Sequence, residues 1–359
     1  MIWVSRRGRW RAAAVLVAFI GIVSLAISAR ATETADAPPI EVLRSVKYAE
    51  PADKPLTADV YLPRGEGPFP GVLVVHGGAW VAGSKGRMSR IGTSLAERGY
   101  VAVSIDYRLA PKHKFPAQLD DCRAALGWMR DNAAAYRLDP RRIGGFGYSA
   151  GAHLVTLLSL SATATLHDPA AATSDRAQAE RCVLQAVVAG GTPCDFQELP
   201  LDSKRLAFWL GGTRRDNAEL YRQASPLAFV TPHSPPMLLY HGEKDLLVPL
   251  PSARALKQSL DQAGVACELL IIEKAGHIST FTDAQALAAA ADFLDRHLRP
   301  SPESSTRPGS PGPCGRPGDQ LNAGSPGPRG RPNVDAASPG TRPEAASPPA
   351  PTHDPADPS

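Results

Sequence analysis

The chain has 359 residues, of which 43% are hydrophobic and 21% are charged, and its formal net charge is +4. This length allows one large globular domain or two small ones. Residues 1–31 contain five arginines and no acidic residue, which more than accounts for the positive charge, so the rest of the chain has no basic excess for binding nucleic acid.

The first 31 residues have the layout of a secretory signal peptide. Four arginines between positions 6 and 11 precede an apolar run over 12–28, and the small residues of Ala29-Arg30-Ala31 follow. The run is close to the lower limit for crossing a bilayer, so an uncleaved membrane anchor is the alternative. We expect a cleaved signal and an exported protein, periplasmic or extracellular, whose only membrane contact would come from this segment if it stays uncleaved.

Between residues 38 and 298, short apolar runs rich in β-branched residues alternate with amphipathic segments. This order predicts one α/β domain with a mostly parallel sheet flanked by helices. The predicted buried strands are 71–75, 101–105, 143–147, 184–189, 237–241 and 267–272, with antiparallel edge strands at 41–49 and 56–62. The predicted helices are 89–98, 118–135, 150–160, 252–263 and 283–297.

Two segments fall outside the alternation. Residues 195–225, which include Phe208 and Trp209, are predicted to form either a small cap or an ordinary surface insertion. Residues 299–359 are rich in Pro, Gly and Ser and have almost no large apolar side chains, which predicts a disordered tail.

The cysteines indicate no metal site. No two of the five form a Cys-x-x-Cys pair and no histidine cluster accompanies them, so we expect neither a metal nor another cofactor. In an exported chain cysteines can form disulfides, and we predict Cys182 with Cys194 as the candidate pair.

A catalytic serine is indicated by Gly147-Tyr148-Ser149-Ala150-Gly151, which lies between a predicted strand and a predicted helix. A sharp turn at this junction projects the serine hydroxyl above the sheet and requires small neighbouring residues. The N–H of Ala150 would face the same spot. We therefore predict Ser149 as a nucleophile.

A base and an orienting carboxylate follow in the order that this motif requires. Asp245 comes just after the predicted strand 237–241, and His277 just after the strand 267–272. Both therefore lie at the carboxyl ends of parallel strands, where such sheets place their ligands. Glu243 is the rival carboxylate, but it comes only two residues after its strand.

The segment His76-Gly77-Gly78-Ala79-Trp80 follows the predicted strand 71–75. Its small residues would let backbone N–H groups converge on a developing oxyanion. We expect His76 to be a structural hydrogen-bonding residue and not a catalytic base.

Together these segments resemble the esterase branch of the α/β-hydrolases that includes hormone-sensitive-lipase-like and feruloyl-esterase-like enzymes, over residues 41–297. The matching pieces are Asp59-Val60-Tyr61-Leu62-Pro63, His76 to Trp80, Asp106-Tyr107-Arg108-Leu109-Ala110-Pro111, Phe115-Pro116-Ala117, Gly147 to Gly151, His241-Gly242-Glu243-Lys244-Asp245 and Gly276-His277. The resemblance implies the α/β-hydrolase fold, the triad Ser149, Asp245 and His277, and structural roles for Asp106 and Arg108. It also implies an oxyanion hole built from the N–H groups of Gly78, Ala79 and Ala150.

One departure bears on the substrate. Hormone-sensitive-lipase-like members usually have a third glycine where this chain has Ala79, and the variant is closer to feruloyl-esterase-like enzymes and kynurenine formamidases. We expect a cofactor-free serine carboxylesterase that acts through an acyl-enzyme on small-molecule, short-chain or carbohydrate-linked esters. An amidase or formamidase with the same triad, or a non-catalytic binding protein on this scaffold, is the alternative.

Overall fold

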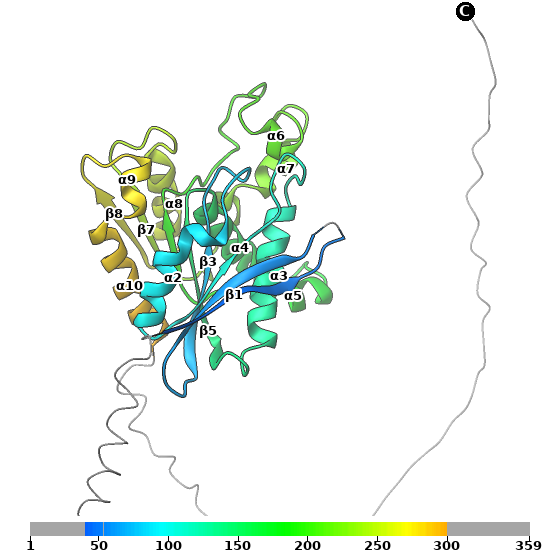
Figure 1. The fold of residues 1–359 in the computed structure, drawn as a ribbon. Coiled ribbons are helices and arrows are strands. Elements are labelled where there is room, and N and C mark those ends of the chain that lie inside the picture. The colour runs from blue at the N-terminus through cyan, green and yellow to red at the C-terminus, as the bar shows by residue number, and fades with distance from the viewer. Residues whose placement is uncertain (1–39, 53, 300–359) are drawn as a thin grey trace, which may run out of the picture. The chain divides into compact units, whose positions relative to one another are not determined.

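The computed structural model describes residues 40–52 and 54–299, which form a twisted sheet with helices on both faces (Figure 1). The predicted signal peptide, residues 1–31, and the predicted tail beyond Arg299 lie outside the described residues. Within those described ranges, no helix has both the length and the apolar character needed to span a membrane.

Eight strands form the sheet in the order β1-β2-β4-β3-β5-β6-β7-β8. They are β1 (Ile40–Ala49), β2 (Leu56–Pro63), β3 (Phe69–Val75), β4 (Val101–Ile105), β5 (Leu138–Tyr148), β6 (Val187–Gly190), β7 (Met237–Gly242) and β8 (Cys267–Ile272). β1 pairs with β2 and β2 with β4 in antiparallel fashion, whereas all other neighbours are parallel. The predicted mostly parallel sheet with antiparallel edge strands is therefore confirmed.

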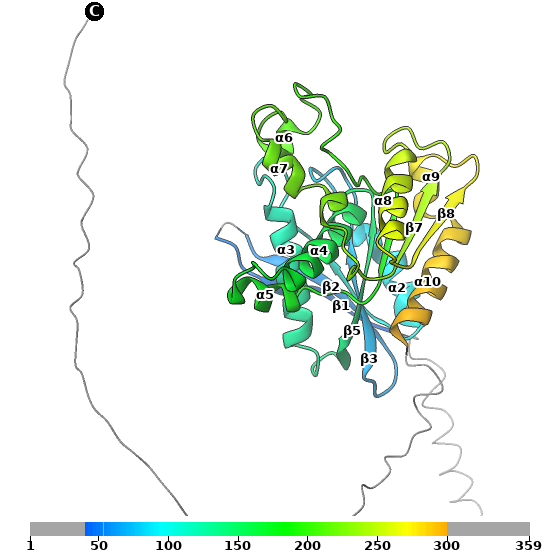
Figure 2. The same ribbon diagram turned by 180° about the vertical axis from the view of Figure 1, so that it is seen from behind.

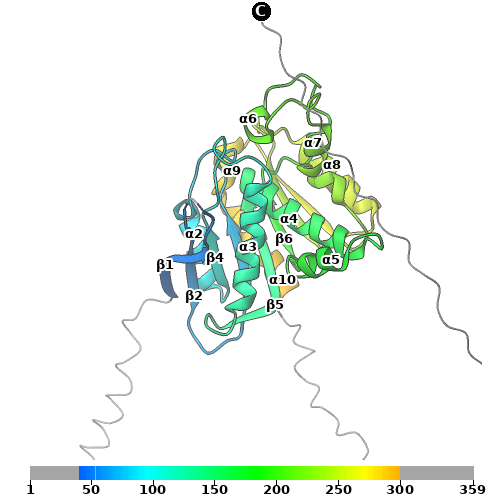
Figure 3. The ribbon, with the colours of Figure 1, turned by 90° about the vertical axis from the view of Figure 1, so that its right-hand side faces the viewer.

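The helices cover the two faces of the sheet unequally. The longer ones are α2 (Ser89–Glu97), α3 (Ala117–Asp131), α4 (Ala150–His167), α8 (Pro251–Gln262) and α10 (Ala284–Leu298). α3, α4 and α8 pack on one face and α2 and α10 on the other, which Figures 2 and 3 show from two sides. Burial on both faces explains why the central strands are short continuous apolar runs.

Residues 195–225 form a cap at the carboxyl ends of the parallel strands. This segment contains α6 (Ala207–Leu210) and α7 (Ala218–Gln223), which lie at the same end of the sheet as α9 (His277–Phe281) (Figure 1). Trp209 and Tyr221 of the cap are fully buried. The segment is thus packed onto the domain instead of forming a loose surface insertion.

The predicted elements differ from the observed ones in a few places. α5 (Thr173–Glu180) is missed because its sequence is polar and Ala179 is its one buried residue. β6 begins three residues later than the predicted strand 184–189. The sequence predicts none of the short helices α6, α7 and α9, the last of which begins at His277. It also does not predict the two 3₁₀ turns, η1 (Lys85–Met88) and η2 (Pro226–Phe229).

The predicted disulfide between Cys182 and Cys194 is wrong. Both residues are buried free thiols. The parallel strand β6 lies between them in the chain, so Cys182 precedes its amino end and Cys194 follows its carboxyl end. The close pair of Cβ atoms that a disulfide requires cannot form across that separation.

Candidate active site

Ser149 lies at a strained turn between β5 and α4. Its backbone has φ 55° and ψ −121°, a conformation that costs a non-glycine residue about 1–3 kcal/mol. Helix α4 begins at the next residue, Ala150, so the unpaired N–H groups of its first turn lie beside the serine. A Cβ atom on Gly151 would lie 2.1 Å from the carbonyl oxygen of Val75, so this position needs glycine for the helix to pack against β3.

His277 and Asp245 are joined by a short hydrogen bond. Asp245 follows β7 and His277 follows β8, and Nδ1 of the histidine lies 2.6 Å from Oδ2 of the aspartate. An ionised carboxylate can only accept, so Nδ1 carries a hydrogen, and in the neutral imidazole Nε2 then has a free electron pair. Oδ1 of Asp245 accepts from the backbone N–H groups of Leu247 and Val248 at 2.9 and 2.8 Å. These contacts fix the orientation of the imidazole.

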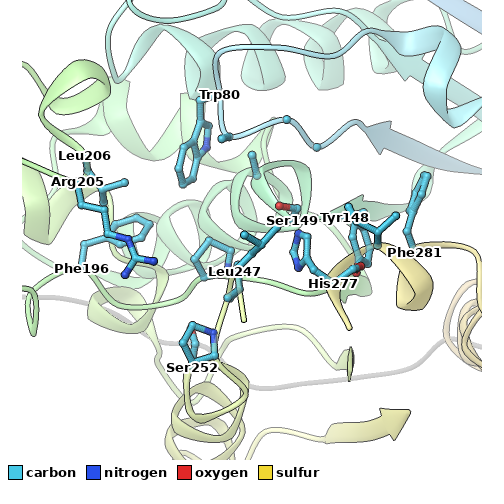
Figure 4. A pocket seen from close by; sticks show the side chains of 18 of the residues that line it. Trp80, Tyr148, Ser149, Phe196, Arg205, Leu206, Leu247, Ser252, His277 and Phe281 are labelled. Carbon is cyan, nitrogen blue, oxygen red and sulfur yellow. The ribbon is translucent and has the colours of Figure 1, made fainter. Parts of the chain in front are cut away.

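Ser149 and His277 line the same cavity, which has a volume of about 710 Å³. In Figure 4 the two side chains lie next to each other, with Trp80 and Phe196 toward the cap and Phe281 on the other side. The structure therefore brings the three predicted residues together at one end of the sheet. The rival carboxylate, Glu243, instead accepts from the backbone N–H of Lys274 at 2.8 Å on the exposed side of the loop.

The loop after β3 presents backbone N–H groups to the same cavity. Gly78, Ala79 and Ala150 all line it, and both Gly78 and Ala79 have positive φ, 127° and 51°. Within the described part of the chain, the N–H groups of Ala79 and Ala150 have no hydrogen-bond acceptor. A Cβ atom on Gly77 would lie 3.2 Å from Cβ of Ser149, so the loop and the serine turn are in close contact. The arrangement can receive an oxyanion formed next to Ser149.

A buried histidine that the sequence analysis did not single out supports this loop. His153 accepts at Nδ1 from the indole N–H of Trp80 at 3.3 Å, and its Nε2 lies 2.7 Å from the carbonyl oxygen of Ala224. Only the neutral tautomer with hydrogen on Nε2 satisfies both contacts, and burial lowers the pKa of His153 to about 4. Trp80 also stacks on Trp209 of the cap, with the two ring centroids 3.9 Å apart. The spacing from Ser149, four residues along α4, is the sequence signal that points to His153.

His76, the residue expected to be structural, is buried beside this loop. Its Nδ1 lies 2.8 Å from the carbonyl oxygen of Gly77 and its ring stacks on Tyr107 at 4.2 Å. Burial lowers the pKa of His76 and favours the neutral form. The residues for which the resemblance implies structural roles form ion pairs: Asp106 with Lys85 and Arg108 with Asp121, each at 2.7 Å.

Most of the cavity wall is apolar, and the sequence analysis did not predict it. The apolar lining residues include Trp80, Met88, Phe196, Leu199, Leu206, Phe208, Leu247, Val248, Ile278 and Phe281. The charged residues on the wall are Arg87, Asp195 and Arg205. Across residues 40–52 and 54–299, no group of three His, Cys, Asp or Glu side chains is arranged to hold a metal ion.

The sheet order, the serine turn and the histidine–aspartate pair at the strand ends define a member of the α/β-hydrolase superfamily. The sequence profile of the BD-FAE family matches residues 58–260, more than half of the chain. The chain therefore belongs to the BD-FAE family, and the predicted relationship to α/β-hydrolase esterases is confirmed.

Similar proteins include esterases from several organisms. Esterase LipQ of Mycobacterium tuberculosis is 33% identical over 198 residues, which cover 55% of this chain and 47% of LipQ. The esterase LipC of the same organism is 32% identical over 200 residues, 54% of this chain and 48% of LipC. The chain thus spans about half the length of these curated relatives. Among solved structures, a truncated carbohydrate esterase from gut microbiota has a TM-score of 0.63 at 26% identity, covering 74% of this chain and 98% of that one.

Proposed function

We propose that the protein is a serine carboxylesterase that hydrolyses esters through an acyl-enzyme intermediate. The observation that carries this proposal is the 2.6 Å hydrogen bond between His277 and Asp245 in the cavity that also holds Ser149. A serine hydroxyl is a weak nucleophile at neutral pH and needs such an oriented base. The esterases among the relatives support the same chemistry.

In the proposed reaction, the Ser149 hydroxyl oxygen attacks the acyl carbonyl carbon while Nε2 of His277 takes its proton. Asp245 stabilises the imidazolium through the hydrogen bond to Nδ1. The N–H groups of Gly78, Ala79 and Ala150 donate to the carbonyl oxygen as it gains charge. His277 then returns the proton to the leaving alcohol, and a water molecule activated by His277 releases the acid and restores Ser149.

The lining of the cavity favours a short acyl group in the part of the substrate that reacts with Ser149. Its walls beside Ser149 are mainly apolar, and the polar contacts that would hold a bare sugar ring are few. Thermogutta terrifontis esterase 2 has been solved with butyrate bound, at 26% identity, a TM-score of 0.59 and coverage of 74% of this chain and 97% of that one. We therefore propose short-chain acyl esters, in which the alcohol half is a small alcohol or a carbohydrate.

The test is hydrolysis of 4-nitrophenyl esters from acetate to laurate, and of an aryl formamide, by the full chain and by its Ser149→Ala variant. We expect turnover that is greatest for the short esters and is lost in the variant, whose thermal unfolding should match the parent protein. A fluorophosphonate probe should label the parent protein only. Folded protein that neither hydrolyses any ester nor reacts with the probe would contradict the proposal.

A further inference from the structure

The cap contains four arginines, at positions 205, 214, 215 and 222, and three of them have partners within the protein. Arg214 donates to two backbone carbonyl oxygens, Arg215 pairs with Asp202, and Arg222 pairs with Glu219. The guanidinium of Arg205 forms no hydrogen bond or ion pair with any residue that the structure describes. Arg205 is also the member of this set that lines the cavity.

Arg205 reaches the cavity between apolar side chains. Figure 4 shows its side chain extending from the cap beside Leu206 and Phe196, on the cap side of Ser149. The acid on the cavity wall, Asp195, uses Oδ1 to accept from the backbone N–H of Gln197 at 2.9 Å. The guanidinium of Arg205 has no partner among the described residues, so its N–H donors and its positive charge remain available to a group that enters the cavity.

We propose that Arg205 is a specificity-determining residue that selects esters carrying a carboxylate on the half of the molecule that lies toward the cap. This inference rests on the proposed carboxylesterase function and adds a substrate class to it. A planar guanidinium matches a carboxylate through two parallel hydrogen bonds. Arg205 is exposed, so water and salt compete with this contact and keep it weak. The reaction at Ser149 is unchanged, and the charge–charge contact lowers the free energy of the bound ester and of its transition state together.

Two matched pairs of substrates test the proposal and locate the charge. In the first pair the charge of the acyl half differs. Mono-4-nitrophenyl glutarate carries a free carboxylate, and its methyl ester is neutral. In the second pair the charge of the alcohol half differs. 4-Acetoxybenzoate carries a free carboxylate, and methyl 4-acetoxybenzoate is neutral. The measurement is the ratio of kcat/KM for the anionic and neutral members, at low and high salt, in the full chain and three variants.

We expect the parent protein to favour the anionic member of one pair by about fivefold, the effect of a partly exposed ion pair. In Arg205→Gln this ratio should fall to about one, and 0.5 M salt should reduce it in the parent protein. Arg215→Gln, which changes a cap arginine paired with Asp202 outside the cavity, should keep the parent ratio. Arg87→Gln changes the other cavity arginine and should also keep it.

The inference is overturned if neither pair shows an anionic preference, if the preference survives Arg205→Gln, or if Arg87→Gln removes it instead. Hydrolysis of the neutral members by the parent protein, and its loss in Ser149→Ala, reports on the proposed function separately. Neutral turnover without charge preference would leave the esterase function standing and remove only the role of Arg205. No turnover of any member would refute both.

Discussion

Replacing Asp245 with asparagine changes one atom beside His277 and keeps the shape of the side chain. Oδ1 of Asp245 accepts from the N–H groups of Leu247 and Val248, so only an oxygen fits there. The new NH₂ group must therefore take the position of Oδ2, 2.6 Å from Nδ1 of His277. Because it is a donor, it forces Nδ1 to accept and moves the ring hydrogen to Nε2.

An imidazole with hydrogen on Nε2 cannot take the proton of Ser149. We expect kcat for 4-nitrophenyl acetate to fall by about 10³- to 10⁴-fold, equivalent to about 4–5.5 kcal/mol in the activation free energy. The melting temperature should change little, because the turn contacts at Oδ1 persist. Initial rates at saturating ester, combined with active-site titration, measure the effect directly.

Glu243→Gln is the matched control. Glu243 lies in the same loop, accepts from the backbone N–H of Lys274, and keeps that acceptor as an amide oxygen. We expect kcat within twofold of the parent protein. A kcat for Asp245→Asn within tenfold of the parent value, or an equal loss in Glu243→Gln, would refute the assignment of Asp245.

Two further predictions concern the frame around the site. Gly151→Ala places a Cβ atom 2.1 Å from the backbone oxygen of Val75, so we expect a loss of about 1–3 kcal/mol in unfolding free energy and of most ester turnover. Gly264→Ala is the control, because Gly264 has φ +75° and open space around it. Its thermal unfolding should show about 1–2 kcal/mol of strain while turnover persists. Parent-like turnover in Gly151→Ala would contradict the prediction. The pKa of His153 is about 4 in the folded protein and near 6.5 in the unfolded chain. Between these two pH values the unfolded chain therefore binds one more proton than the folded protein. The stability that is present above pH 6.5 is lost as the pH falls to about 4, and the loss in unfolding free energy reaches up to about 3 kcal/mol. Denaturant unfolding of the parent protein and of His153→Gln between pH 4 and 6.5 tests this prediction. An equal loss of stability in both proteins would contradict the assignment of the pH effect to His153.

The sequence predicts the fold well where the chain is strongly apolar. The strands 101–105 and 267–272 are predicted with the observed bounds, because short apolar runs flanked by turn residues have few alternative structures. The polar helix Thr173–Glu180 is missed for the opposite reason, since one buried alanine leaves no periodic pattern to detect. Its position is decided by contact with α4, which is a tertiary effect.

The reacting groups of the candidate site were also predictable, whereas its walls were not. Ser149 and His277 are found from local patterns, because a nucleophile turn and a strand end each have a short sequence signature. Arg205 and Phe196 line the same cavity as Ser149 only because of the path that the cap takes over the sheet. No local pattern encodes that path, so the sequence points to the chemistry more directly than to the substrate.

Different contacts hold the serine turn and the cavity face of the cap. Val75 pairs with Gly147 in the sheet register, which sets the end of β3 beside the serine turn, and glycines at 77 and 151 let the two backbones touch. The strain at Ala79 and Ser149, both with positive φ, can persist because this packing leaves the chain no room to relax. The cap contacts this frame through Trp209, which stacks on Trp80, and through the carbonyl oxygen of Ala224, which accepts a hydrogen bond from His153. The Arg205 side chain makes neither contact, so it can change without moving the serine. Substitutions at the backbone contacts should therefore alter kcat for every ester, and substitutions on the cap should alter the ratio between esters.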